Sequence, residues 1–136
     1  MDNNTNFSDV LSSYGRCLLK RGFIERFYEL FMASDDSIRA LFARTDMSKQ
    51  TIALRRGIST AISFAEGSGI VKGTMTERAM VHSRKGRVPI EPRLYRHWLE
   101  SILKAVREYD PAANAKLMAR WQQALKPAVD HFIELY

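Results

Sequence analysis

The stretch "HSRKGRVP", residues 82–89, joins one of only three histidines in the chain to a basic turn that contains a glycine and ends at a proline. Helical periodicity precedes this stretch and resumes after it, and Gly86 and Pro89 mark the break between the two segments. His82 is therefore expected at the end of a helix. From there its ring can project into the space between that helix and whatever packs opposite.

The segments on both sides of this turn have the apolar spacing of amphipathic helices, and no alternating segment of convincing length predicts a strand. We therefore expect an all-α fold. The first expected helix ends before Arg21, the second covers residues 23–32, and a short third helix reaches Phe42. A long helix capped by Thr45 or Asp46 follows and is broken at Gly67, and a shorter one covers about 74–83. The next helix has Pro92 in its first turn and ends at Asp110, and the last runs from about 113 to the C-terminus with a kink at Pro127.

The composition predicts one globular domain covering residues 1–136, because the chain is 46% apolar and 26% charged. The first ten residues, MDNNTNFSDV, lack the pattern of a secretory signal, and no window of about 18 residues is apolar and uncharged. A single cysteine, Cys17, excludes an internal disulfide and is expected in the core. We expect a cytoplasmic protein with no membrane partner.

Two helical faces are candidates for the space opposite His82. At about 100° per residue, Gln50, Leu54, Gly57 and Ala61 fall close to one line of the long helix, so one polar group is followed by a large apolar group and two small ones. Small residues leave room for a flat ligand. On the second helix, Tyr28 is the one polar-tipped aromatic residue on its apolar face, and a buried hydroxyl needs a partner.

These residues resemble the globin family, most closely the bacterial single-domain haemoglobins and the globin domain of the flavohaemoglobins. The intervals of 14 residues from Tyr28 to Phe42, eight to Gln50 and 32 to His82 fit the bacterial pattern without a gap. The segment "HSRKGRVP" resembles the one that bears the proximal haem-ligating histidine. The resemblance covers nearly the whole chain and implies a globin-like helical sandwich that encloses a haem pocket.

The resemblance implies haem b as the cofactor, with His82 as the iron ligand and Tyr28 and Gln50 as the distal pair. An imidazole suits iron, and its other ring nitrogen is expected to donate to a backbone carbonyl. Without a CxxCH motif, covalent c-type attachment is excluded. The other residues expected to line the haem or bind its propionates are Phe42, Arg44, Leu54, Gly57, Arg84, Arg87, Val88 and Tyr95.

Structural alternatives stay open for several of these residues. A single histidine near a helix end is most often a surface or structural residue, Tyr28 could be a core tyrosine bonded to a backbone carbonyl, and a shift of one residue would replace Gln50 by Thr51. Arg78, one turn before His82, occupies a place that is usually apolar in globins and could turn toward solvent or a propionate. Tyr95 and Glu134 could correspond to the tyrosine and glutamate that act on the proximal histidine in flavohaemoglobins.

The function implied is reversible binding of O2, and also of NO and CO, at a five-coordinate iron by a monomer or homodimer. One alternative is an NO dioxygenase that needs a separate reductase, since no GxGxxG motif is present. Another is a haem-based gas or redox sensor. The net charge of +6 leaves a nucleic-acid-binding protein as a third, but the basic residues form no stripe with stacking aromatics, so no nucleic-acid partner is expected.

Overall fold

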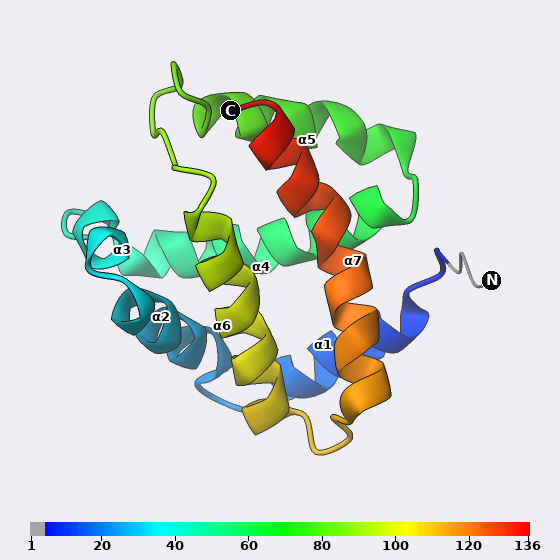
Figure 1. Ribbon diagram of the computed structural model, residues 1–136. Helices are drawn as coiled ribbons and strands as arrows, with labels where there is room; N and C mark the ends of the chain where they lie inside the picture. Colours follow the sequence, from blue (N-terminus) through cyan, green and yellow to red (C-terminus); the bar gives the residue numbers. More distant parts are fainter. Residues whose placement is uncertain (1–4) are drawn as a thin grey trace.

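The computed structural model describes residues 5–136, which fold into seven α-helices with no strand in this range (Figure 1). Residues 1–4, which belong to the expected domain and to the N-terminal stretch searched for a secretory signal, lie outside the described residues. The all-α class is confirmed. The helices are α1 (Ser8–Leu19), α2 (Phe23–Ser34), α3 (Asp36–Leu41), α4 (Met47–Ala65), α5 (Gly69–Val81), α6 (Leu94–Tyr109) and α7 (Ala115–Glu134).

The helices pack against one another in crossing pairs. In Figure 1, α6 and α7 run side by side across the front of the molecule, and α4 crosses behind α7, on which it packs. Helix α2 packs on α6, while α5 contacts both α4 and α7. The chain ends beside the turn that follows α5, where the backbone N–H of Arg84 donates to the Tyr136 carbonyl over 2.9 Å. The arrangement is the helical sandwich that the sequence predicted.

Local side-chain caps explain where three helices begin. The Asp35 carboxylate accepts from the Ser37 amide at 2.9 Å before α3, and the Asn114 side chain accepts from the Leu117 amide at 2.8 Å before α7. Asp46 accepts from the Ser48 amide at 3.1 Å, so Asp46 and not Thr45 caps α4. Each cap satisfies an amide that has no partner within its helix.

Two expected boundaries were wrong. Helix α5 begins at Gly69, not near residue 74, because Ser68 takes the extended N-cap conformation and the burial of Met75 and Ala79 anchors the helix despite its glycines. Helix α6 begins at Leu94, so Pro92 is not in its first turn: Pro92 belongs to a preceding turn closed by the Tyr95 amide on the Pro92 carbonyl at 3.2 Å. Pro127 lies inside α7.

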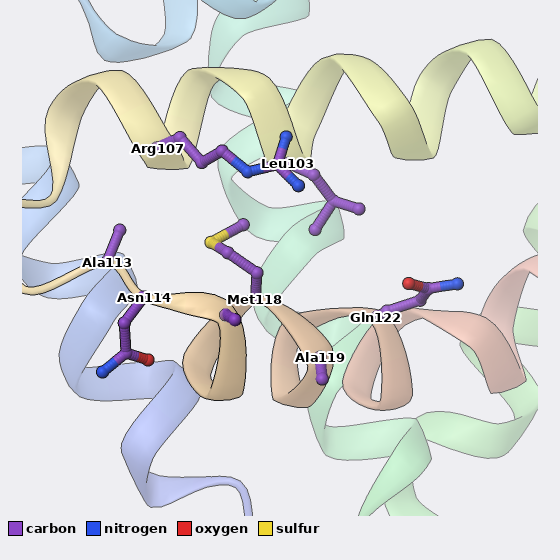
Figure 2. Close-up of a pocket in the computed structure, with 8 residues that line it drawn as sticks. Leu103, Arg107, Ala113, Asn114, Met118, Ala119 and Gln122 are labelled. Atoms are coloured by element: carbon purple, nitrogen blue, oxygen red, sulfur yellow. The ribbon is translucent and has the colours of Figure 1, made fainter.

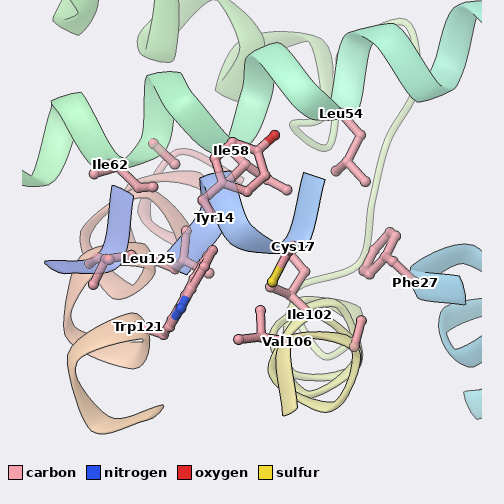
Figure 3. Packing of buried hydrophobic residues seen from close by; sticks show 14 of the residues in the cluster. Tyr14, Cys17, Phe27, Leu54, Ile58, Ile62, Ile102, Val106, Trp121 and Leu125 are labelled. Carbon is pink, nitrogen blue, oxygen red and sulfur yellow. The ribbon is translucent and has the colours of Figure 1, made fainter. Parts of the chain in front are cut away.

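Apolar side chains from α1, α2, α4, α6 and α7 meet in one core (Figure 3). Trp121 of α7 is fully buried between Tyr14 and Leu125, and Ile58 and Ile62 of α4 close the other side. Cys17 is also fully buried, and burial raises the pKa of its thiol to about 12. This places Cys17 in the core, as predicted, and makes it unreactive.

One polar network is buried in this core. The Asp110 carboxylate, whose side chain is 0% exposed, accepts from the Ser13 hydroxyl at 2.5 Å and from the Arg16 guanidinium at 2.8 Å. The Ala112 amide donates to it at 2.9 Å, and the Trp121 indole N–H donates to Ser13 at 2.9 Å. The network ties the end of α6 to α1 and α7, and each of its own buried polar groups has a partner.

None of the helices described within residues 5–136 has the length and apolar character needed to span a lipid bilayer.

Candidate functional site

His82 is the residue that ends α5, and its backbone amide donates to the Arg78 carbonyl at 3.2 Å. The ring is half-buried, and its Nδ1 lies 2.9 Å from the Val88 carbonyl oxygen. Because a carbonyl can only accept, Nδ1 carries the proton in this contact, so the Nδ1–H tautomer has its lone pair on Nε2. This is the tautomer that a metal-ligating histidine needs, held by the backbone carbonyl expected from the sequence.

The turn after His82 is closed by backbone hydrogen bonds. The Val88 amide donates to the Val81 carbonyl at 2.9 Å, and the Ile90 amide donates to the His82 carbonyl at 3.0 Å. At Gly86, a Cβ atom would overlap the carbonyl oxygens of Met80 and Val81. The turn that positions the Val88 carbonyl against the imidazole therefore requires glycine at position 86.

We expect Gly86→Ala to lower the free energy of unfolding by about 1–3 kcal/mol, because backbone atoms cannot yield as a flexible side chain can. The imidazole orientation should change as well, since the Val88 carbonyl moves with the turn. Chemical denaturation followed by circular dichroism measures the first effect. Gly73→Ala, in the preceding helix α5, is the control, because nothing lies within 4 Å of its Cβ position. Equal stability of the two variants would contradict the close packing at Gly86.

Aromatic side chains surround the imidazole on its α6 and α7 side. The ring centroid of Phe132 lies 5.9 Å from that of His82, and the Tyr95 ring meets Phe132 edge-on at 5.7 Å. The Tyr95 hydroxyl is buried with no hydrogen-bond partner among residues 5–136, and burial raises its pKa. Glu134 is exposed and is not bonded to it, so the two residues do not form the flavohaemoglobin-like pair in this structure.

Tyr28 and Gln50 also come together. Tyr28 is 5% exposed, and its hydroxyl donates to the Gln50 carbonyl over 3.4 Å, a long and therefore weak hydrogen bond. Burial raises the pKa of Tyr28 to about 12, against a smaller lowering by a hydrogen bond with the Gln50 side chain. Phe42 packs edge-on against Tyr28 at 5.5 Å. The backbone-bonded tyrosine that the sequence left as an alternative is thus present, with a partner that holds it only weakly.

Leu54 and Gly57, which follow Gln50 along the same face of α4, differ in burial. Leu54 is 8% exposed and Gly57 is half-buried. A guanidinium nitrogen of Arg78 would lie 3.3 Å from a Cβ at Gly57, so the Arg78 side chain reaches across from α5 and covers this glycine. Arg78, at a position that is usually apolar in globins, therefore occupies part of the space that Gly57 leaves free.

The remaining expected residues lie on the surface. Arg84, Arg87 and Val88 are exposed on the His82 turn, with the Arg84 guanidinium over the Tyr136 ring at 5.1 Å from its centroid. Arg44 is exposed in the segment between α3 and α4. The structure thus brings the expected residues into two groups, one around His82 and one around Tyr28. Among residues 5–136, no hydrogen bond or ring contact joins the two groups.

Two open surface pockets lie away from both groups. One, of about 600 Å³, is enclosed by α6 and the start of α7, where Arg107 and Leu103 face Met118 (Figure 2). The other, of about 560 Å³, lies on the side of α4 turned away from Gln50 and is lined in part by Arg55, Arg56 and Arg78. No feature used above predicted either pocket, because each depends on how separate helices pack against one another.

The helical sandwich, with a histidine at the end of the helix packed on α4, defines a protein of the globin fold class. No family model and no curated protein matches the sequence. The solved structure of protein PA3967 from Pseudomonas aeruginosa PAO1, described as structurally highly homologous to a human haemoglobin, matches with a TM-score of 0.91 and 36% sequence identity over 96% of this chain and 98% of that one. The chain belongs to the globin family.

Proposed function

We propose that the protein is a haem-b-binding globin that binds O2 reversibly, and also NO and CO, with His82 as the iron ligand. The observation that carries the proposal is the hydrogen bond from Nδ1 of His82 to the Val88 carbonyl, which leaves Nε2 available as a ligand. The described likeness of the neighbour PA3967 to a human haemoglobin supports it. A cytoplasmic location and an external reductase are part of the same proposal.

The residues present fit an iron porphyrin by their chemistry. When bound, haem supplies an iron with an open coordination position at which a diatomic gas can bind. His82 would bind the iron through Nε2, and no histidine precedes it in the sequence. Phe42, Leu54, Gly57, Val88 and Tyr95 are the proposed apolar lining. Arg44, Arg84 and Arg87 are exposed cations suited to the two propionates, where water and salt keep each contact modest.

Tyr28 and Gln50 are the proposed hydrogen-bond donors to the gas. With its pKa raised to about 12, the Tyr28 phenol stays protonated at neutral pH and can donate. Its bond to the Gln50 carbonyl is long at 3.4 Å, so turning toward a polar ligand sacrifices little. When haem is bound, this donor pair should favour O2 over CO, because O2 is the better hydrogen-bond acceptor of the two.

We expect Tyr28→Phe to raise the O2 dissociation rate of the haem-loaded protein by roughly ten- to a hundredfold, which corresponds to one charge-assisted hydrogen bond. The CO dissociation rate should change much less. Stopped-flow replacement of O2 by CO measures the first rate, and replacement of CO by NO the second. Gln50→Leu is the companion variant, with a smaller expected effect. An O2 dissociation rate unaltered in both variants would contradict the assignment of the pair.

The function itself is tested by the absorption spectrum of the purified protein, reduced with dithionite, with and without CO. A five-coordinate ferrous spectrum that shifts to a CO-bound spectrum supports the proposal. A protein that is colourless and does not bind added hemin overturns it.

A further inference from the structure

The open pocket on the side of α4 turned away from Gln50 has a lining that the proposed gas chemistry does not use. Its residues come from three helices: Tyr14 and Leu18 of α1, Ile52, Arg55, Arg56, Ser59 and Thr60 of α4, and Arg78 of α5. Residues of α1 and α5 thus line the same pocket as residues of α4. The pocket is therefore a product of the tertiary fold.

Its charge is positive and unbalanced. The pocket contains three arginines and no carboxylate, and none of the three forms an ion pair among residues 5–136. Helix α4 itself has no acidic residue from Met47 to Ala65. The acids that flank it are engaged elsewhere: Asp46 caps the helix, and Glu66 accepts from the Phe7 amide at 2.9 Å. Nothing described in the chain neutralises this cluster.

Arginines from two helices line this one pocket. Arg78 extends from α5 to α4, where the absence of a side chain at Gly57 allows its nitrogen within 3.3 Å of the Cβ position. The hydroxyls of Ser59 and Thr60 donate to backbone carbonyls of α4 at 3.4 and 2.8 Å. The donors left for a ligand are thus the three arginines. A planar guanidinium, with its fork of donors, matches phosphate oxygens in particular.

We propose that this pocket, which we call the α4 arginine pocket (Arg55, Arg56 and Arg78), binds a small anion carrying two or more phosphate groups. Three arginines without an ion-pair partner among residues 5–136 line one hollow, which favours a multiply charged anion over a single carboxylate. Its volume of about 560 Å³ suits a small molecule. Arg55 and Arg56 are not among the residues proposed to hold haem, whereas Arg78 also covers Gly57 of the proposed haem lining.

The test is isothermal titration of the full chain with inorganic triphosphate at about 50 and 150 mM salt. The triple variant Arg55→Gln, Arg56→Gln, Arg78→Gln should bind at least about tenfold more weakly. The matched control, Arg21→Gln, Lys104→Gln, Arg107→Gln, removes the same charge from exposed sites elsewhere and should retain the original affinity. Arg78→Gln alone should also weaken binding, because the site needs α5.

Three results would overturn the proposal. They are the absence of binding by the unaltered protein at about 1 mM triphosphate, an equal loss in both triple variants, and an unchanged affinity in the pocket variant. Equal loss would mean that only the net charge attracts the anion. Circular dichroism verifies that each variant is folded, and the haem content, measured separately, keeps a failure here distinct from a failure of the gas-binding proposal.

Discussion

Replacing His82 by alanine should leave a folded chain that no longer retains haem. The proposed attachment consists of one iron–nitrogen bond and apolar burial, without covalent linkage, so loss of the imidazole removes the only directional bond. The ring makes few structural contacts: its Nδ1 bonds to the exposed Val88 segment, and it packs on Phe132 at 5.9 Å. The helices should therefore form without it.

Haem content per chain and the intensity of the Soret band measure this loss, and far-ultraviolet circular dichroism verifies folding. His97→Ala is the matched control, because His97 is also half-buried but has no proposed role in haem binding. Its ring lies beside Asp35, with 4.0 Å between Nε2 and a carboxylate oxygen. In His82→Gly, added imidazole should restore haem binding by filling the space of the side chain. Full haem content in His82→Ala, or a loss in His97→Ala alone, would show that the ligand is misassigned.

Replacing Asp110 by alanine should cost about 3–5 kcal/mol of unfolding free energy, the usual cost of removing one partner from a buried charged network. The substitution leaves the Ser13 hydroxyl and the Ala112 amide without their acceptor in a core that excludes water, and it frees Arg16. Urea denaturation followed by circular dichroism gives the value. Asp130→Ala, which breaks only the exposed Lys126–Asp130 pair, should cost less than about 1 kcal/mol.

The pH dependence of the same two proteins gives an independent check. The hydrogen bond from Arg16 is the main cause that holds the pKa of Asp110 at about 2, below its ordinary value of 3.8. Because the folded-state pKa is the lower one, the carboxylate stabilises the fold fully above pH 3.8, and this contribution falls as the pH drops toward 2. The difference between wild type and Asp110→Ala should shrink over that range. A difference that is constant from pH 6 to pH 2 would contradict the charged network.

The helices could be predicted from the sequence because the signals that define them act within a few residues. Apolar spacing gave the buried faces, and Asp35, Asp46 and Asn114 cap amides that are two or three positions away. The start of α5 was missed because Gly69 and Gly73 look like breaks, although tertiary packing of Met75 and Ala79 keeps that segment helical. Local propensity is weak enough for such packing to override it.

For the candidate site, the sequence placed His82 before a turn and predicted a carbonyl partner for its ring, since both belong to one short segment. The partner's identity, Val88, and the burial of the Tyr95 hydroxyl depend on how that turn folds against α6 and α7. The bond from Tyr28 to Gln50 joins two helices, and the two residues are 22 positions apart in the sequence. Its weak geometry could not be predicted from residue order.

The all-α class, a cap at Thr45 or Asp46 and the histidine at the end of α5 therefore follow from residue order, because these features depend on neighbours along the chain. In the sequence, Asp110 is simply the end of a helix. The packing of the helices is what brings it to Ser13 and Arg16, at separations of 97 and 94 residues. It also decided that Arg78 crosses to α4 and joins Arg55 and Arg56. Such contacts depend on how the helices cross, and that geometry is set by the packing of the whole core.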